Sequence, residues 1–162
     1  MRNTRQKDIL ETLQEREVVA LMSQMLFKEA GTRYAREQAW KPHQDNAYPQ
    51  NPNGQYITTN LFLADADKEN GALYIYPGSH KLGLLSAESA PSYREAKGKA
   101  PGSRTLMPAE WEDRHVDVNF KKGDLLVLHG NCIHGSYSNF SERSRPLYSC
   151  SLISKGEYFI PG

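Results

Sequence analysis

The feature that most constrains the fold is a series of short apolar runs separated by turn-forming residues. Runs rich in β-branched and aromatic residues occupy residues 56–63, 72–76, 115–120, 125–129 and 147–154. Between them lie clusters of Gly, Pro, Asn and Asp, which favour turns over regular structure. Short strands spaced in this way are typical of antiparallel sandwiches and jelly rolls.

The spacing of these runs also suggests which strands pair. We expect residues 56–63 to form a hairpin with residues 72–76 across the turn ADADKENG, and residues 115–120 to form a second hairpin with residues 125–129 across KKGD. Antiparallel neighbours joined by short polar turns commonly pair in this way. The prediction is therefore a sheet built from local hairpins.

The start of the chain has two different patterns. Residues 4–16 place Ile9, Leu10 and Leu13 on one side of a charged segment, which predicts a short amphipathic helix that begins near Thr4. The apolar run at residues 18–27 fits a strand or a buried helix. A strand is favoured because Gly31 follows soon after and apolar residues occupy alternate positions, which are Val19, Leu21, Met25 and Phe27.

Composition narrows the class of partner. The chain has 162 residues, enough for one domain, and its 20 basic and 19 acidic residues give no electrostatic reason to expect a nucleic acid or membrane partner. We expect a small-molecule ligand instead. No apolar run approaches the ~20 residues of a membrane span and no secretory signal is evident, so a cytoplasmic location with Cys132 and Cys150 as reduced thiols is expected.

The segment from residue 84 to residue 114 has no sustained period. A loop this long in a compact domain usually has a function, so we expect it to form a lid over a site. Tyr48, Tyr74 and Tyr76 are expected to border the same pocket.

A possible metal site comes from His43 and Asp45. In an extended strand the residues i and i+2 face the same side, so this imidazole and carboxylate can meet at one point while Gln44 faces away. His134 is the best third ligand, because it follows a strand and a turn that could return it to residue 43. A lone H-x-D pair is more often a surface feature. The competitors for the third position are His80 and His129.

Arg145 strengthens the case for a site. It lies eleven positions after His134, and a hairpin turn at residues 138–144 would place it on the neighbouring strand near Ser136. A guanidinium there could hold a carboxylate through two parallel hydrogen bonds, with the serine hydroxyl adding a third. The alternative for Arg145 is a surface ion pair, since Arg143 lies two residues earlier.

Four separated motifs stand out: PHQD at 42–45, ENGALYIYPGSH at 69–80, GDLLVLHGNCIHGS at 123–136 and the arginine eleven positions beyond His134. Together they resemble the phytanoyl-CoA dioxygenase family of iron(II)- and 2-oxoglutarate-dependent oxygenases. They occur in the order of the family, over about residues 20–160. The resemblance implies a mainly β protein: a double-stranded β-helix, or cupin-like jelly roll, with a short N-terminal helix.

The resemblance also implies roles for individual residues. His43, Asp45 and His134 look like the iron ligands, and Arg145 and Ser136 look like the pair that holds the distal carboxylate of 2-oxoglutarate. Met25 is similar to a family methionine that lines the cosubstrate. Asn60 stands where the family often has tryptophan, and either hydrogen-bonds 2-oxoglutarate or supports its strand.

The implied reaction uses iron(II), 2-oxoglutarate and molecular oxygen to hydroxylate an unactivated C–H bond of a small organic substrate, with release of succinate and carbon dioxide. Asp45 favours hydroxylation, because related halogenases have a small apolar residue in its place. Two alternatives stay open: a non-catalytic jelly roll that binds a metal or a small acid, and a zinc hydrolase. The absence of an obvious general base beside the triad counts against the hydrolase.

Family members are usually longer than this chain. We therefore expect residues 1–162 to be one jelly-roll domain, with the alternative that they are a fragment that lacks outer N- and C-terminal elements. The sequence predicts neither the identity of the substrate nor an oligomeric state.

Overall fold

The computed structural model describes residues 4–88 and 103–160. Helix α1 spans Thr4–Gln14 and helix α2 spans Arg33–Glu37. Three short 3-10 turns also occur in the described part of the chain: η1 (Asp45–Ala47), η2 (Ser79–Leu82) and η3 (Ala109–Trp111). None of the described helices is long and apolar enough to cross a membrane. The predicted helix near Thr4 is confirmed.

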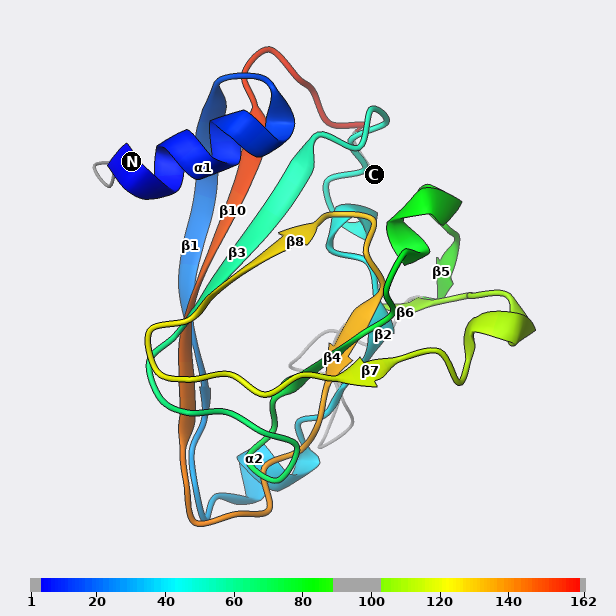
Figure 1. Ribbon diagram of the computed structural model, residues 1–162. Coiled ribbons are helices and arrows are strands. Elements are labelled where there is room, and N and C mark those ends of the chain that lie inside the picture. The colour runs from blue at the N-terminus through cyan, green and yellow to red at the C-terminus, as the bar shows by residue number, and fades with distance from the viewer. Residues whose placement is uncertain (1–3, 89–102, 161–162) are drawn as a thin grey trace.

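Two antiparallel four-stranded sheets form the body of the protein (Figure 1). The first sheet has the order β1-β10-β3-β8, built from Val18–Lys28, Arg145–Ser154, Tyr56–Phe62 and Leu125–His129. The second has the order β2-β9-β4-β7, built from Trp40–His43, His134–Ser136, Leu73–Ile75 and Val116–Asp117. A small separate sheet pairs β5 (Ala87–Glu88) with β6 (Arg104–Thr105). The mainly β prediction is confirmed.

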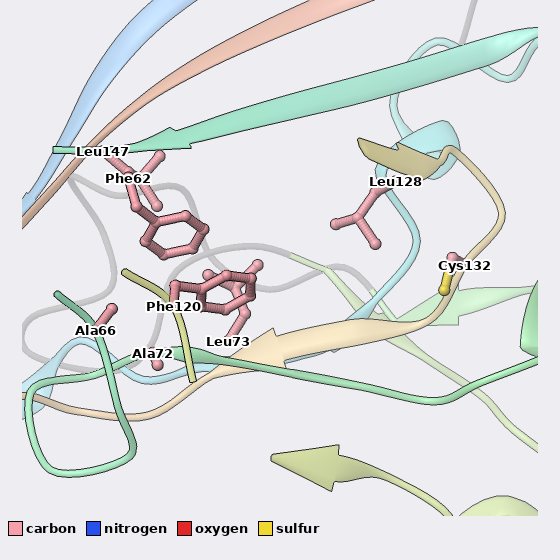
Figure 2. Packing of buried hydrophobic residues seen from close by; sticks show 8 residues of the cluster. All are labelled: Phe62, Ala66, Ala72, Leu73, Phe120, Leu128, Cys132 and Leu147. Carbon is pink, nitrogen blue, oxygen red and sulfur yellow. The ribbon is translucent and has the colours of Figure 1, made fainter. Parts of the chain in front are cut away.

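The hydrophobic core lies between the two large sheets. Figure 2 shows Phe62 from β3 stacked on Phe120, with ring centroids 3.9 Å apart, and Leu73 of β4 close by. Such a stacked pair adds to the stabilisation that comes from burying two rings. The core thus joins residues that are 58 positions apart in sequence, from Phe62 to Phe120.

A second, smaller apolar cluster attaches helix α1 to the outer side of the first sheet. The side chain of Leu10 is fully buried against Ile57, Cys150 and Leu152. Figure 1 shows α1 crossing β1 and β10. Both cysteines are buried and unpaired; Cys150 lies in β10, as predicted for a strand, whereas Cys132 lies in the turn before β9.

The two predicted hairpins are wrong. Strand β3 pairs with β10 and β8, whereas β4 pairs with β9 and β7 in the other sheet. Strand β7 likewise pairs with β4 and not with β8. The turns that looked like hairpin loops carry the chain from one sheet to the other, because burying the apolar face of each strand requires the opposite sheet.

The strand predicted at residues 18–27 is confirmed as β1, but its odd positions do not share one face. The pairing register with β10 shifts by one residue between Ala20 and Met22. Before the shift Val19 pairs with an odd-numbered residue of β10, Ile153, whereas after it Met25 pairs with an even-numbered one, Tyr148. A one-residue shift moves all following side chains to the opposite face. After the shift the even positions of β1 face the space between the sheets.

Candidate metal and cosubstrate site

A pocket of about 1170 Å³ opens between the two large sheets. Both sheets contribute side chains to it, and so does the segment that follows η2. Three of its described lining residues have an acidic or basic side chain other than histidine: Lys28, Asp45 and Arg145. Two buried imidazoles, those of His43 and His134, also reach the pocket.

The two histidines are neighbours because their strands pair. His43 is the last residue of β2 and lies opposite His134, the first residue of β9, in the antiparallel ladder. Their ring centroids are 4.4 Å apart. The ladder therefore sets the separation of the two imidazoles, as a directly paired position in an antiparallel sheet does.

Asp45 joins the pair from a turn and not from the strand. Strand β2 ends at His43 and the 3-10 turn η1 begins at Asp45, so the expected i, i+2 strand geometry does not apply. The carboxylate Oδ1 still lies 3.5 Å from Nε2 of His43 and 3.7 Å from Nε2 of His134. Ligand atoms of all three residues lie within 4.8 Å of one another, close enough to hold one metal ion.

Hydrogen bonds fix which ring nitrogens face the carboxylate. Nδ1 of His43 lies 2.7 Å from the carbonyl oxygen of Lys41, and Nδ1 of His134 lies 3.1 Å from that of Cys132. A carbonyl only accepts, so each Nδ1 carries a hydrogen and donates it. Each Nε2 is left with its lone pair towards the pocket, which is the form that binds a metal.

Other side chains hold Asp45 and its turn. Thr58 on β3 donates a hydrogen bond to Oδ2 of Asp45. The fully buried amide of Gln44 points away from the triad, donates to the carbonyl oxygens of Gly83 and Asn131 and accepts from the backbone of Leu85. Sequence reasoning missed Thr58. The alternation in YITTNLF could have indicated it, because Thr58 and Asn60 fall on one face of β3.

The triad perturbs the pKa of each of its members. Burial raises the pKa of Asp45, but the charges of the histidines and the hydrogen bonds outweigh it and the net pKa is lowered. Burial lowers the pKa of His134, and Asp45 only partly offsets it. For His43, burial is outweighed by Asp45 and the net pKa is raised. An ionised carboxylate beside two imidazoles is a donor set suited to a divalent transition metal.

Arg145 lies in the same pocket and is nearly fully buried. Its Nε donates to the carbonyl oxygen of Gly71 at 3.1 Å, and its Nη1 has no hydrogen-bond partner. Burial lowers the pKa of its guanidinium to about 10. Among the ion pairs of the described residues none includes Arg145, so the surface ion pair considered for it is wrong.

The route by which Arg145 reaches Ser136 differs from the prediction. The two residues lie in different sheets, on β10 and β9, and Arg145 pairs with Lys28 of β1. The predicted hairpin between them is therefore wrong. Lys28 bridges the gap, because its ammonium donates to Oγ of Ser136 at 2.7 Å. Both Ser136 and Arg145 line the pocket.

The two remaining predicted cosubstrate residues occupy different positions. Asn60 is buried on β3, opposite Ser149, and lines the pocket. Met25 also forms part of the wall, but it pairs with Tyr148 and is 44% exposed. A contact between Met25 and the cosubstrate remains a prediction.

The competing residues lie elsewhere. The rings of His80 and His129 pack on each other at 5.3 Å, and Nδ1 of His129 accepts from the backbone of Asn131. Arg143 is exposed and donates to both carboxylate oxygens of Asp67. None of these three residues is among the described residues that line the pocket.

The predicted border of the pocket is only partly correct. Tyr48 lines it together with Leu84 and Leu85. Tyr74 does not, because its hydroxyl donates to the carbonyl oxygen of Trp40 and its ring packs with Tyr76 and other rings outside the pocket. Part of the segment predicted as a lid, residues 89–102, lies outside the described residues.

Comparison with known proteins identifies the family. A family model described as phytanoyl-CoA dioxygenase (PhyH) matches residues 4–147. The chain belongs to the phytanoyl-CoA dioxygenase family. It is 32% identical over 143 residues to the phytanoyl-CoA dioxygenase of Arabidopsis thaliana, covering 85% of this chain and 45% of that protein. It is 33% identical over 138 residues to phytanoyl-CoA dioxygenase domain-containing protein 1 of Bos taurus, covering 83% of this chain and 45% of that protein.

A solved structure supports the fold. The epimerase SnoN, in complex with Fe3+, alpha ketoglutarate and nogalamycin RO, superposes with a TM-score of 0.79 at 21% identity, covering 98% of this chain and 59% of that chain. The predicted jelly roll is therefore confirmed. The chain spans about half the length of the curated relatives it matches. Family membership and the donor set support iron(II) and 2-oxoglutarate as the cofactors of this site.

Proposed function

We propose that the chain is an iron(II)- and 2-oxoglutarate-dependent dioxygenase that hydroxylates an unactivated C–H bond of a small organic substrate. One observation carries the proposal. A triad able to hold a metal ion and a buried guanidinium with an unpaired Nη1 line the same pocket. A ligand that chelates a metal at one end and carries a carboxylate at the other would satisfy both groups.

In this proposal each side chain has a defined task. Nε2 of His43, Nε2 of His134 and the carboxylate of Asp45 hold the iron, which supplies the oxidising chemistry once 2-oxoglutarate and oxygen are bound. Thr58 keeps the Asp45 carboxylate in one orientation. Arg145 binds the distal carboxylate of the cosubstrate, and Ser136 donates to the same group.

The wall of the pocket suggests what kind of substrate enters it. Tyr48, Leu84 and Leu85 add uncharged, largely apolar side chains to the described lining. An uncharged or largely apolar organic molecule fits such a wall, because a charged group there would lose its hydration without gaining a partner. A single jelly-roll domain over residues 1–162 is part of the same proposal, as both sheets share one core.

The zinc hydrolase alternative lacks a base. Metal-dependent hydrolysis commonly needs a carboxylate or histidine near the metal-bound water in addition to the ligands. Asp45 is the one carboxylate among the described lining residues, and it belongs to the triad. Two cationic side chains in the pocket, Lys28 and Arg145, favour a dicarboxylate ligand instead.

One experiment separates the oxygenase from its rivals. Iron(II) and 2-oxoglutarate, added without oxygen, are expected to give a charge-transfer absorption band, and oxygen is then expected to release succinate even without a substrate. The band without succinate would indicate a binding module. Tight zinc binding with neither signal would indicate a hydrolase.

A second measurement addresses hydroxylation itself. SnoN has the same fold and is an epimerase, so an oxidised C–H bond need not end as an alcohol in every protein of this fold. Once a substrate is found by succinate release, the reaction is run under isotopically labelled oxygen gas. We expect one labelled oxygen atom in the product. A product of unchanged mass would contradict hydroxylation.

A further inference from the structure

Lys28 is a buried lysine with no carboxylate partner. It is the last residue of β1, is 1% exposed and lines the pocket. Its Nζ donates to Oγ of Ser136 and to the carbonyl oxygen of Tyr137. None of the ion pairs found among the described residues includes it. A lysine in such a position is uncommon, because a buried charge without a counterion is costly.

Lys28 and Arg145 form a pair of basic side chains. They lie directly opposite each other in the β1–β10 ladder, and both reach the pocket. Gly71 positions both groups: its carbonyl oxygen accepts from Nε of Arg145, and a side chain at residue 71 would place its Cβ 2.7 Å from Cδ of Lys28. Gly71 also has a φ of +88°, which favours glycine. The glycine therefore leaves the space through which the lysine stem passes.

We propose that Lys28 positions the distal carboxylate of 2-oxoglutarate, by holding Ser136 as a hydrogen-bond donor to that carboxylate and by adding a second positive charge beside Arg145. The inference rests on the proposed function and extends it to a residue that the motifs did not indicate.

The direction of the Lys28–Ser136 hydrogen bond supports this role. Once an anion is bound and Lys28 is protonated, its ammonium has three N–H groups and no lone pair, so Oγ of Ser136 must then be the acceptor in the 2.7 Å bond. The hydrogen of the serine hydroxyl is then directed to another acceptor. Two of the three N–H groups of Lys28 are used by Ser136 and Tyr137, which leaves one for a ligand oxygen.

The charges support it as well. Burial and, to a lesser degree, the charge of Arg145 penalise the protonated form of Lys28 and lower its pKa to about 6, so the amine is mostly uncharged at neutral pH while no anion is bound. An anion bound between them would remove this penalty, since an opposite charge favours the protonated form. The carboxylate of a ligand is the missing counterion, because Asp45, the acid among the described lining residues, is engaged with the histidines.

The test compares two ligands and one substitution. Lys28→Gln keeps a hydrogen-bond donor for Ser136 or Tyr137 and removes the charge. Its affinity for 2-oxoglutarate and for 2-oxopentanoate, which has a methyl group where 2-oxoglutarate has the distal carboxylate, is measured by calorimetry on the iron(II)-loaded protein without oxygen. We expect the Kd of 2-oxoglutarate to rise about 10- to 100-fold. The Kd of 2-oxopentanoate should change by no more than about twofold.

The outcomes separate this inference from the proposed function. Equal weakening of both ligands would show that Lys28 only supports the structure, and no change in either would show that it has no role; both overturn the inference. Failure of the unsubstituted protein to bind 2-oxoglutarate would overturn the proposed function instead. Lys68→Gln is the matched control, since Lys68 lies over the outer side of the Tyr137 ring, 4.6 Å from its centroid. It should leave both affinities unchanged.

Two further measurements keep the test decisive if Lys28→Gln does not fold. Lys28→Met retains an unbranched stem over Gly71 and is expected to show the same difference between the two ligands. In the unsubstituted protein, the Cε resonance of 13C-labelled Lys28 should shift on addition of 2-oxoglutarate and stay in place with 2-oxopentanoate. A resonance that responds to both ligands alike, or to neither, overturns the inference.

Discussion

The two ends of the pocket balance their charges differently. At the end formed by β2, η1 and β9, the carboxylate of Asp45 lies beside two imidazoles and accepts from Thr58. At the other end, the cationic end, the basic side chains of Lys28 and Arg145 are buried, and Nη1 of Arg145 has no hydrogen-bond partner. The first end suits an added cation and the second an added anion. A ligand that satisfies both must join a metal-binding group to a carboxylate.

The largest expected effect comes from neutralising the acid at the first end. Asp45→Asn removes the negative ligand but keeps the shape of the side chain. Side chains that only support metal ligands contribute about 10- to 100-fold in affinity, so loss of a ligand itself should cost more. We expect no detectable iron(II) binding in an anaerobic equilibrium dialysis. Asp67→Asn, on the surface beside Arg143, is the control. Retained iron affinity in Asp45→Asn would remove Asp45 from the site.

The next effect concerns the second end. Arg145→Gln removes the guanidinium, and breaking a buried charge pair typically costs about 3 to 5 kcal/mol. We therefore expect 2-oxoglutarate to bind roughly two to four decades more weakly, while iron(II) affinity is unchanged. Calorimetry with the metal-loaded protein measures both.

Arg143→Gln is a matched control for that variant. Arg143 lies two residues away, but it is exposed and pairs with Asp67 and Glu69. An exposed ion pair contributes little, so neither ligand affinity should move. If the two arginine variants behaved alike, the distinction between a pocket arginine and a surface arginine would be lost.

The three residues of the first end could be picked out from the sequence, and so could Arg145 and Ser136 at the second end, whereas Lys28 could not. The imidazoles of His43 and His134 belong to recognisable motifs, and alternating apolar residues indicate the strands around them. Lys28 looks like a polar residue that ends an apolar strand. Its burial depends on Gly71 and Ser136, which are far away in sequence and reach it only once both sheets have formed. Contacts between residues so far apart in the sequence leave no signal in the residues around Lys28.

The same reason explains the wrong hairpins. The turn between β3 and β4 has the composition of a hairpin loop, because turn residues are chosen by local backbone geometry. Whether the next strand pairs with the previous one or crosses to the opposite sheet is decided by which faces must be buried. Here β3 receives β10 and β8 as neighbours, strands that follow it by more than 60 residues. Arg145 therefore reaches the pocket by a different route from the one the local pattern suggested.

A smaller effect should come from the residue that supports the acid. Thr58→Val preserves the shape and removes the hydroxyl that donates to Asp45. We expect iron(II) to bind about 10- to 100-fold more weakly. Thr59→Val provides the control, because Thr59 donates to the carbonyl oxygen of Cys150 on the other side of β3. If iron(II) bound more weakly to Thr59→Val but not to Thr58→Val, the support for Asp45 would come from the opposite face of β3 and the role given to Thr58 would be wrong.

The smallest effect concerns Asn60, for which the sequence left two roles open. Asn60 lies on the same face of β3 as Thr58, two residues further towards the cationic end, and it lines the pocket. If its amide hydrogen-bonds the cosubstrate, Asn60→Leu should weaken 2-oxoglutarate binding by about 2- to 10-fold, the worth of one neutral hydrogen bond. Metal affinity should not change.

A supporting role for Asn60 in its strand predicts a different result. If Asn60 only supports its strand, Asn60→Leu should alter the free energy of unfolding of the ligand-free protein and leave the Kd of 2-oxoglutarate unchanged. Urea titration and calorimetry on the same variant therefore distinguish the two roles. A change in 2-oxoglutarate affinity without a change in stability would place Asn60 with Arg145 at the cationic end. The opposite result would leave that end to the residues of β1, β9 and β10 alone.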